Sequence, residues 1–350
     1  MKISDILARW YDDHKRDLPW RKTKDPYAIW VSEIVLQQTR VVQGIDYYHN
    51  FMNRFPDLQS LTDAKIEEVL RVWQGLGYYS RARNMHAAAG QMIMDHGGKF
   101  PSSYGEMLKL KGIGPYTAAA IASIAFNEPR AVVDGNVHRL IARLFGLFEP
   151  PGLAGAKCGI CRQAEALLDQ SKPGLHNQAV MEFGALVCTP ANPSCRSCPL
   201  QKYCAAFGNN QVKELPVRSK KIKQKQRYFH YLIMHSGNRI LIRQRTGKDI
   251  WQHLFEFPLI ETPRPISPGR LMESPSWQQI FMHGGGKPIR VSKIIRHILT
   301  HQVIHAKFYH LEYFPADNEF KSSFQEVPLS EIGNYPVPKL IENYLEILID

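Results

Sequence analysis

Residues 110–117 read Leu-Lys-Gly-Ile-Gly-Pro-Tyr-Thr, a glycine-rich turn that runs directly into an apolar stretch. Gly112 and Gly114 permit a tight turn, and Pro115 suits the first turn of a helix. Backbone N–H groups at the start of such a helix point outward and can bind a phosphate group. Small residues follow, mostly alanines between positions 118 and 122, and they allow close helix packing. Taken alone, the stretch predicts a turn between two helices, and its surroundings decide whether it binds phosphate.

The spacing of apolar residues divides the chain into two regions. Residues 1–210 carry the helical periodicity in several segments separated by turn signals. Residues 211–227 are rich in Lys and Arg and poor in apolar residues, which predicts a solvated basic linker. After it, residues 228–235 and 239–245 flank a Ser-Gly-Asn turn, as in a β-hairpin. We therefore expect an all-α domain before the linker and a smaller α+β domain over 228–350.

The composition is typical of a soluble protein that binds a polyanion. The 350 residues include 44 Lys and Arg against 32 Asp and Glu, so the formal net charge is +12. Nucleic acid is the commonest partner of such a chain, although charge alone does not separate DNA from RNA or anionic lipid. The N-terminal segment has no signal-peptide core, and residues 118–126 are too short to span a bilayer. We expect a cytoplasmic protein, which in a bacterium would act on nucleoid DNA.

All six cysteines fall between positions 158 and 204, and four of them have the spacing of a metal site. These four, in the pattern C-x6-C-x2-C-x5-C, are Cys188, Cys195, Cys198 and Cys204. Four thiolates can hold one zinc ion or one [4Fe–4S] cluster, and the spacing alone does not choose between the two. Cys158 and Cys161 form a separate C-x-x-C to which the sequence assigns no role.

Five segments together resemble one family of enzymes. They are D-L-P-W-R at 17–21, W-V-S-E-I-V-L-Q-Q-T-R-V at 30–41, L-K-G-I-G-P-Y-T at 110–117, V-V-D-G-N-V-H-R at 132–139 and the cysteine pattern at 188–204. The set resembles the helix-hairpin-helix DNA glycosylases of the endonuclease III superfamily, and the two N-terminal segments resemble the members that remove adenine. The resemblance implies an all-α catalytic domain over 1–210, with the helix-hairpin-helix near 108–120 and a [4Fe–4S] cluster in the loop 188–204.

The C-terminal region resembles the Nudix-like domain of the adenine-removing members. Residues 251–258, W-Q-H-L-F-E-F-P, match its W-x-x-x-x-E-F-P-type segment. No acidic metal-binding helix follows, so we do not expect this domain to hydrolyse pyrophosphates. The resemblance implies that Leu299, Thr300 and His301 recognise 8-oxoguanine, at the place where the family has a Phe-Ser-His-type loop. Thr300 retains a hydroxyl group, whereas Leu299 replaces the aromatic ring.

Two carboxylates are candidates for the chemistry. Cleaving adenine from deoxyribose needs a proton donor near the base and negative charge near the sugar, because adenine is a poor leaving group and the sugar becomes cation-like. Glu33 lies in an apolar helical segment, where burial would raise its pKa and keep it protonated. Asp134 precedes an apolar helix and is a candidate N-cap. The resemblance implies that Glu33 protonates N7 of adenine and that Asp134 stabilises the sugar cation.

Tyr116 stands where strand-cleaving relatives carry a lysine whose amine forms a Schiff base with the sugar. A phenol cannot form an imine, so the resemblance implies a glycosylase without lyase activity. It also places Tyr116 near Asp134 and makes Asn136 a polar partner in the same pocket.

The target adenine must leave the duplex to reach such a pocket. The resemblance assigns DNA contacts to several residues: Arg16, Arg21, Gln38, Thr39, Leu76, Tyr78, Gly112 and Gly114. Among them, Gln38 would fill the gap in the duplex, and Leu76 and Tyr78 would wedge beside 8-oxoguanine.

The resemblance therefore implies a monomeric adenine DNA glycosylase of base excision repair that carries a [4Fe–4S] cluster. Its substrate would be double-stranded DNA with adenine opposite 8-oxoguanine or guanine, and it would have no membrane partner. One alternative is an endonuclease III-like glycosylase and lyase for oxidised pyrimidines, against which Tyr116 and the C-terminal domain argue. The other is a non-catalytic iron–sulfur DNA-binding protein, which would need neither Glu33 nor Asp134.

Overall fold

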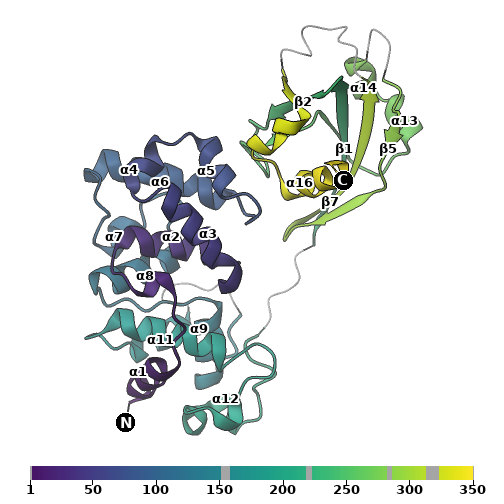
Figure 1. Ribbon diagram of the computed structural model, residues 1–350. Coiled ribbons are helices and arrows are strands. Elements are labelled where there is room, and N and C mark those ends of the chain that lie inside the picture. The colour runs from purple at the N-terminus through teal and green to yellow at the C-terminus, as the bar shows by residue number, and fades with distance from the viewer. Residues whose placement is uncertain (1, 151–157, 218–222, 282–285, 313–322, 350) are drawn as a thin grey trace. The chain divides into compact units, whose positions relative to one another are not determined.

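The computed structural model describes most of the chain, in the ranges 2–150, 158–217, 223–281, 286–312 and 323–349. Contacts between Cα atoms group the residues into two units (Figure 1). The first unit comprises 1–63 and 84–220, and the second comprises 64–83 and 221–350. Part of the predicted basic linker, residues 218–222, lies outside the described residues.

The first unit consists of helices joined by short turns. In chain order its α-helices are α1 (Ile3–His14), α2 (Pro26–Leu36), α3 (Val41–Arg54), α4 (Leu58–Asp63), most of α6 (Ser80–His96), α7 (Tyr104–Met107), α8 (Pro115–Phe126), α9 (Gly135–Phe145), α10 (Gly159–Leu167), α11 (Pro173–Leu186) and α12 (Ala205–Gly208). Short 3₁₀ turns are η1 (Pro19–Arg21), η3 (Cys195–Ser197) and η4 (Gln201–Tyr203). The predicted all-α character of this region is confirmed.

Local signals in the sequence set where the functional helices begin. The Asp25 carboxylate accepts hydrogen bonds from the backbone N–H groups of Tyr27 and Ala28 at the start of α2. The Asp134 carboxylate accepts a hydrogen bond from the backbone N–H of Val137 at the start of α9, which confirms the predicted N-cap. Since α2 is apolar on all sides, it is buried along nearly its whole length.

Two glycines on α11 allow it to approach its neighbours closely. A Cβ atom on Gly174 would lie 2.7 Å from the carbonyl oxygen of Ser123 on α8, and one on Gly184 would lie 2.9 Å from Cβ of Asn136 on α9. Neither position can accept a larger residue without movement of the helices. This close packing brings the C-terminal half of α11 to the start of α9, where a pocket forms.

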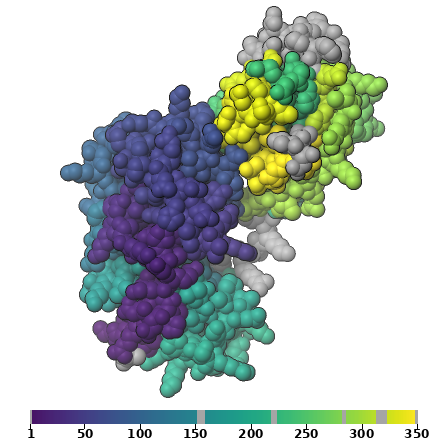
Figure 2. Space-filling model, in the orientation of Figure 1, coloured from purple at the N-terminus to yellow at the C-terminus, as the bar shows by residue number. Residues whose placement is uncertain are grey.

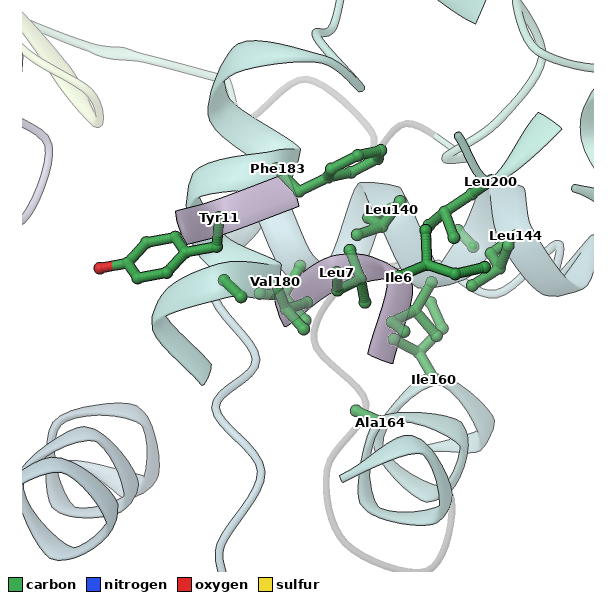
Figure 3. Packing of buried hydrophobic residues seen from close by; sticks show 14 of the residues in the cluster. Ile6, Leu7, Tyr11, Leu140, Leu144, Ile160, Ala164, Val180, Phe183 and Leu200 are labelled. Carbon is green, nitrogen blue, oxygen red and sulfur yellow. The ribbon is translucent and has the colours of Figure 1, made fainter. Parts of the chain in front are cut away.

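The main core of this unit joins segments from both ends of the helical region. Helix α1 packs on α11, and in Figure 2 the purple N-terminal segment lies directly against the teal helices that come much later in the chain. Figure 3 shows residues of this cluster, which include Leu7 from α1, Leu140 from α9, Ile160 from α10 and Phe183 from α11. The cluster therefore ties the helices that follow the pocket to the N-terminus of the chain.

The second unit contains a mixed sheet together with α5 (Ile66–Val72). Among the described residues the strands are β1 (Lys225–Ser236), β2 (Arg239–Gln244), β3 (Phe255–Glu256), β4 (Leu259–Thr262), β5 (Arg290–Val291), β6 (Ile295–Ile298), β7 (Gln302–Glu312) and β8 (Gln325–Pro328). The remaining elements are α13 (Pro268–Met272), α14 (Pro275–Ile280), η5 (Leu329–Asn334) and α16 (Lys339–Ile349). This arrangement confirms the predicted α+β class.

Pairing of the two long strands organises the sheet. β1 and β7 run parallel from Lys225 opposite Gln302 to His235 opposite Glu312, and the other pairs are antiparallel. The predicted hairpin is confirmed as β1 and β2 around Gly237 and Asn238. Trp277 of α14 packs on Tyr309, whereas Tyr344 of α16 stacks on Phe308, so the two helices cover opposite faces of β7. No helix among the described residues is long and apolar enough to cross a membrane.

Candidate active site

A pocket of about 900 Å³ opens within the helical unit. It is lined by η1, α2, the loop after α2, and the N-termini of α8 and α9, with α11 as the opposite wall. Of the predicted residues, this pocket brings together Glu33, Tyr116, Asp134 and Asn136, and also Arg16, Arg21, Gln38 and Thr39.

Glu33 projects from the buried helix α2 into the pocket and is only 7% exposed. Burial raises the pKa of this carboxyl to about 7, and the negative charge of Asp134 adds to the rise while a hydrogen bond from Tyr116 opposes it. The predicted direction of the pKa change is therefore confirmed. At neutral pH a large fraction of the Glu33 carboxyl is protonated and can donate its proton.

Tyr116 lies in the first turn of α8, directly after the glycine-rich turn. Its hydroxyl donates a hydrogen bond to Oε2 of Glu33 at 2.5 Å, and Sδ of Met181 lies 3.8 Å from the same hydroxyl. Burial raises the pKa of the phenol well above its usual value, so it remains protonated. Tyr116 therefore acts on Glu33 through a direct hydrogen bond, while Asp134 acts on Glu33 through its charge.

Asp134 is held at the start of α9 by hydrogen bonds to both carboxylate oxygens. Oδ1 accepts from the N–H of Val137 at 2.7 Å, and Oδ2 accepts from the Asn136 amide at 2.8 Å. Burial raises its pKa, and these hydrogen bonds work against the rise. Asn136 in turn accepts a hydrogen bond from Arg139, whose guanidinium also donates to the carbonyl oxygen of Cys188 at 2.6 Å.

The opposite wall of the pocket contains a carboxylate that the sequence analysis missed. Glu182 on α11 accepts hydrogen bonds from Arg16 at 2.8 and 2.6 Å and from Arg21 at 3.0 and 2.7 Å. Burial by itself would raise the pKa of Glu182, but the hydrogen bonds from the two arginines outweigh it and lower the pKa to about 2. Both arginines thus lie in the pocket wall, paired with Glu182. The sequence feature that could have identified Glu182 is the presence of a glutamate inside an apolar helical stretch.

Gln38 and Thr39 form part of the rim of the pocket. Gln38 is exposed and has a φ of +57°, a left-handed conformation that is uncommon outside glycine. Gln37 anchors this loop, because its side-chain amide donates to the hydroxyl of Thr117 on α8 at 3.3 Å. The backbone at Gln38 is therefore turned sharply at the mouth of the pocket.

The two glycines of the predicted hairpin have different reasons to be there. Gly112 has a φ of +77°, and a Cβ atom on it would lie 2.5 Å from Cβ of Asn84, so the fold requires glycine. Gly114 has an ordinary φ of −91° at the N-cap of α8, and a Cβ atom there would meet nothing within 4 Å. Open space therefore lies in front of the backbone at Gly114.

The four clustered cysteines line one small cavity of about 30 Å³ next to α9 and α11. All four are partly buried and free of disulfide bonds. Arg143 lies 3.5 Å from Sγ of Cys188 and would stabilise negative charge on it. Among the described residues, no group of three or more His, Cys, Asp or Glu side chains is arranged to hold a metal ion. The donor type, four thiols around an otherwise mainly apolar cavity, fits a thiolate-bound cluster.

The second unit brings two of the predicted recognition residues together. The hydroxyls of Tyr78 and Thr300 share a hydrogen bond of 2.7 Å. Thr300 lies between β6 and β7 in a tight turn, in which the N–H of Leu299 donates to the carbonyl oxygen of Gln302 at 2.8 Å. Thr300 and His301 are exposed. Tyr78 is 48% exposed but Leu76 only 8%, so Tyr78 is the more accessible of the two predicted wedge residues.

Known proteins resemble both units. Residues 31–153 match the HhH-GPD superfamily of base excision DNA repair proteins, and residues 230–346 match the NUDIX domain. The chain is 36% identical over 263 residues to an adenine DNA glycosylase of Buchnera aphidicola from Schizaphis graminum, a match that covers 74% of this chain and 75% of that protein. It is 44% identical to the adenine DNA glycosylase of Rattus norvegicus, where the match covers 60% of this chain and 43% of the longer rat protein.

Solved structures resemble the helical unit. A thermostable thymine-DNA glycosylase superposes with a TM-score of 0.54 at 29% identity, over 59% of this chain and 95% of that chain. A trapped endonuclease III–DNA covalent intermediate superposes with a TM-score of 0.51 at 21% identity, over 59% of this chain and 94% of that chain. The second likeness supports the fold alone.

Proposed function

The chain belongs to the adenine DNA glycosylases of base excision repair, and from this premise we propose that it is a monofunctional enzyme that removes adenine paired with 8-oxoguanine or guanine. The observation that carries the proposal is the pairing of a buried, largely protonated Glu33 with a hydrogen-bonded Asp134 in one pocket. An acid and a carboxylate in one site are what cleavage of a glycosidic bond requires.

In the proposed reaction, adenine leaves the duplex and enters the pocket. Glu33 donates its proton to N7 of the base, the bond from the base to C1′ breaks, and adenine leaves as a neutral molecule. The Asp134 carboxylate stabilises the positive charge that develops on the sugar. A water molecule then adds to C1′ and returns a proton to Glu33. Asn136 keeps the Asp134 carboxylate in place.

The absence of lyase activity follows from the groups around the pocket. A lyase needs an amine that attacks C1′ and remains bound as a Schiff base. Within the described part of the chain, the residues that line the pocket include four arginines but no lysine. Tyr116 supplies a protonated phenol in place of an amine.

We assign DNA contacts to the rim of the pocket and to the hairpin. The open backbone at Gly114 and the N-terminus of α8 suit a phosphate group. Gln38 and Thr39 line the pocket, and we assign to Gln38 the filling of the gap left by the extruded base. Arg16 and Arg21 are paired with Glu182 in the pocket wall, so we assign them to shaping the adenine pocket more than to phosphate contacts.

We propose that Tyr78, Thr300 and His301 recognise the base opposite adenine. The hydrogen bond between Tyr78 and Thr300 holds two exposed hydroxyl groups next to each other, where they can donate to or accept from a base. Leu299 holds the turn through its backbone, and its side chain offers only apolar contact. Leu76 is buried, so we assign the contact with the opposite base to Tyr78 and not to Leu76.

A [4Fe–4S] cluster would be held by the four clustered cysteines, which are Cys188, Cys195, Cys198 and Cys204. When bound, such a cluster supplies covalent cross-links within a short loop and has no part in the proton transfers above. Arg139 connects the cluster loop to the active-site pocket, because its guanidinium donates hydrogen bonds to the Cys188 carbonyl oxygen and to Asn136.

One experiment tests the proposal against both alternatives. A duplex with a single adenine opposite 8-oxoguanine is incubated with the protein, and half of the product is treated with hot alkali. We expect strand cleavage only after alkali. Cleavage without alkali would indicate a lyase, and a bound but uncleaved duplex would indicate a non-catalytic binding protein.

A second experiment tests recognition of the opposite base. Thr300→Val keeps the shape of the side chain and removes the hydroxyl group, so we expect it to lower the preference for 8-oxoguanine over guanine by roughly 3- to 10-fold. Thr300→Ser is the matched control and should retain the preference. An unchanged preference in Thr300→Val would contradict the assignment.

A further inference from the structure

Cys158 and Cys161 are separate from the four cysteines of the cluster cavity. The structure pairs them as a disulfide, with Cα atoms 5.2 Å apart, a distance that needs no backbone movement. Neither residue lines the cysteine cavity or the active-site pocket. The pair therefore lies outside both of these sites.

The first turn of α10 holds the pair. Cys158 is the N-cap residue, and its Sγ accepts a hydrogen bond from the N–H of Cys161 at 3.0 Å. The Glu149 carboxylate accepts hydrogen bonds from the two N–H groups that precede Cys161, those of Gly159 at 2.8 Å and Ile160 at 3.3 Å. The helix N-terminus and the Cys161 N–H favour a thiolate at Cys158, and the charge of Glu149 opposes it. Of the two sulfurs, Cys158 has the direct N–H donor and is the better leaving group.

The two cysteines differ in exposure, as thiol exchange at one of them requires. Cys158 is only 4% exposed and packs into the core cluster of the unit, whereas Cys161 is partly exposed. Because Cys161 is the more exposed residue of the pair, a small thiolate from solution is expected to approach the disulfide from the side of Cys161. Attack at Cys161 then expels Cys158, the sulfur that the helix N-terminus stabilises.

We propose that Cys158 and Cys161 form a reversible thiol–disulfide site that exchanges with small-molecule thiols through Cys161. A thiolate attacks Sγ of Cys161, the bond between the two protein sulfurs breaks, and Cys158 leaves as a thiolate. A second thiolate attacks the outer sulfur of the mixed disulfide and releases Cys161 as a thiolate. In total, two thiols become one small-molecule disulfide, and the two protein sulfurs receive two electrons and two protons.

The consequence of oxidation is mechanical, because α10 has a defined place in the core. Ile160 and Ala164 project from α10 into the core cluster together with Leu144 of α9 (Figure 3). α9 is also the helix whose N-terminus is capped by Asp134. A disulfide across the first turn of α10 therefore fastens the helix that packs behind α9, and reduction releases that turn.

Peptide mapping tests the exchange on the intact protein. The holoprotein is equilibrated without oxygen at set ratios of reduced to oxidised glutathione, quenched with acid and alkylated in denaturant. Trypsin cleaves after Lys157 and Arg162, so the pair is recovered in the single peptide 158–162, apart from the cluster cysteines. We expect this peptide to change from an internal disulfide to two alkylated thiols as the ratio rises. A peptide that stays alkylated at every ratio, stays oxidised at every ratio, or carries glutathione on Cys158 and not on Cys161 would overturn the proposal.

Thermal unfolding tests the consequence. Reduction should lower the unfolding midpoint of the helical unit, followed by circular dichroism, by roughly 2–4 °C. The variant Cys158→Ser/Cys161→Ser should have the same midpoint under both conditions. Ser103→Ala, which removes a hydroxyl cap from α7, is the matched control and should retain the full redox difference. An equal redox difference in the double serine variant would assign the effect to other cysteines and overturn the proposal.

Discussion

The two walls of the active-site pocket each present a buried glutamate, and the two carboxyl groups have opposite properties. Glu33 on α2 has its pKa raised to about 7, whereas Glu182 on α11 has its pKa lowered to about 2. Burial alone would raise both values. Glu33 has one neutral hydrogen-bond donor, the Tyr116 hydroxyl, while Glu182 has two guanidinium groups. The partners, and not the depth of burial, make one glutamate an acid and the other a permanent anion.

The largest expected effect comes from removing the acid of the first wall. Glu33→Gln keeps the size of the side chain and removes the transferable proton, so we expect adenine excision to slow by roughly 10²- to 10⁴-fold. Single-turnover rates on a duplex with adenine opposite 8-oxoguanine measure this loss, and a mobility-shift assay should show that DNA binding persists. Glu106→Gln, a change on the exposed surface, is the control. A normal rate in Glu33→Gln would remove Glu33 from the mechanism.

Removing the anion of the second wall should instead reduce stability. Glu182→Gln leaves two guanidinium groups facing each other without a carboxylate, and breaking a buried ion pair costs about 3–5 kcal/mol. Denaturant unfolding at neutral pH measures this change in the free energy of unfolding. Glu33→Gln should show no such loss, which makes it the matched control. A change below about 1 kcal/mol in Glu182→Gln would mean that solvent already screens the cluster.

The dependence of stability on pH should have opposite signs for the two walls. Between pH 4.5 and about 7 the folded state keeps the Glu33 proton that the unfolded chain has lost, so this carboxyl makes stability fall as pH rises. The pKa of Glu182 is below its usual value, so its stabilising effect is complete above pH 4.5 and is lost as pH falls toward about 2. Calorimetry of the wild type and Glu33→Gln across pH 4–8 should show that this loss of stability between pH 4.5 and about 7 occurs only in the wild type. Parallel curves would contradict a raised pKa at Glu33.

The smallest effect is expected for the hydrogen bond between the hydroxyl of Tyr116 and Glu33. Tyr116→Phe removes a neutral donor, and such a bond is worth about 1 kcal/mol, so excision should slow only several-fold. The bond lowers the pKa of Glu33, so its loss should move the decline of excision to higher pH. A pH–rate profile measures both effects. A profile that stays in place would show that Tyr116 acts by position alone.

Much of the fold could be predicted because its signals are local. The Asp134 cap acts on Val137, three residues away, and the turn at Gly237 joins two adjoining strands. The long range of β7 could not be read from its own residues, because its parallel pairing with β1 extends it back to Gln302. The sequence analysis expected this strand from residue 307 to residue 314, of which 313 and 314 lie outside the described residues.

The candidate site could be predicted only in part, because some of its contacts join residues that are far apart in sequence. The apolar segment around Glu33 and the family resemblance together made it a candidate buried acid, and its side chain is buried in the structure. Glu182 was missed because its partners, Arg16 and Arg21, are more than 160 residues away in sequence. The two arginines were expected among the DNA-binding residues near the catalytic pocket, and the structure places both in the pocket wall, paired with Glu182.

The sequence by itself determined that the first 210 residues are helical, that Asp134 caps a helix and which residue types are available for chemistry, because caps, turns and helical periodicity act over a few neighbouring residues. Only the tertiary structure decided which carboxyl group is the acid and which is the anion. A pKa depends on the charges and hydrogen-bond donors that surround a group in space, and here packing brings those groups from distant parts of the chain.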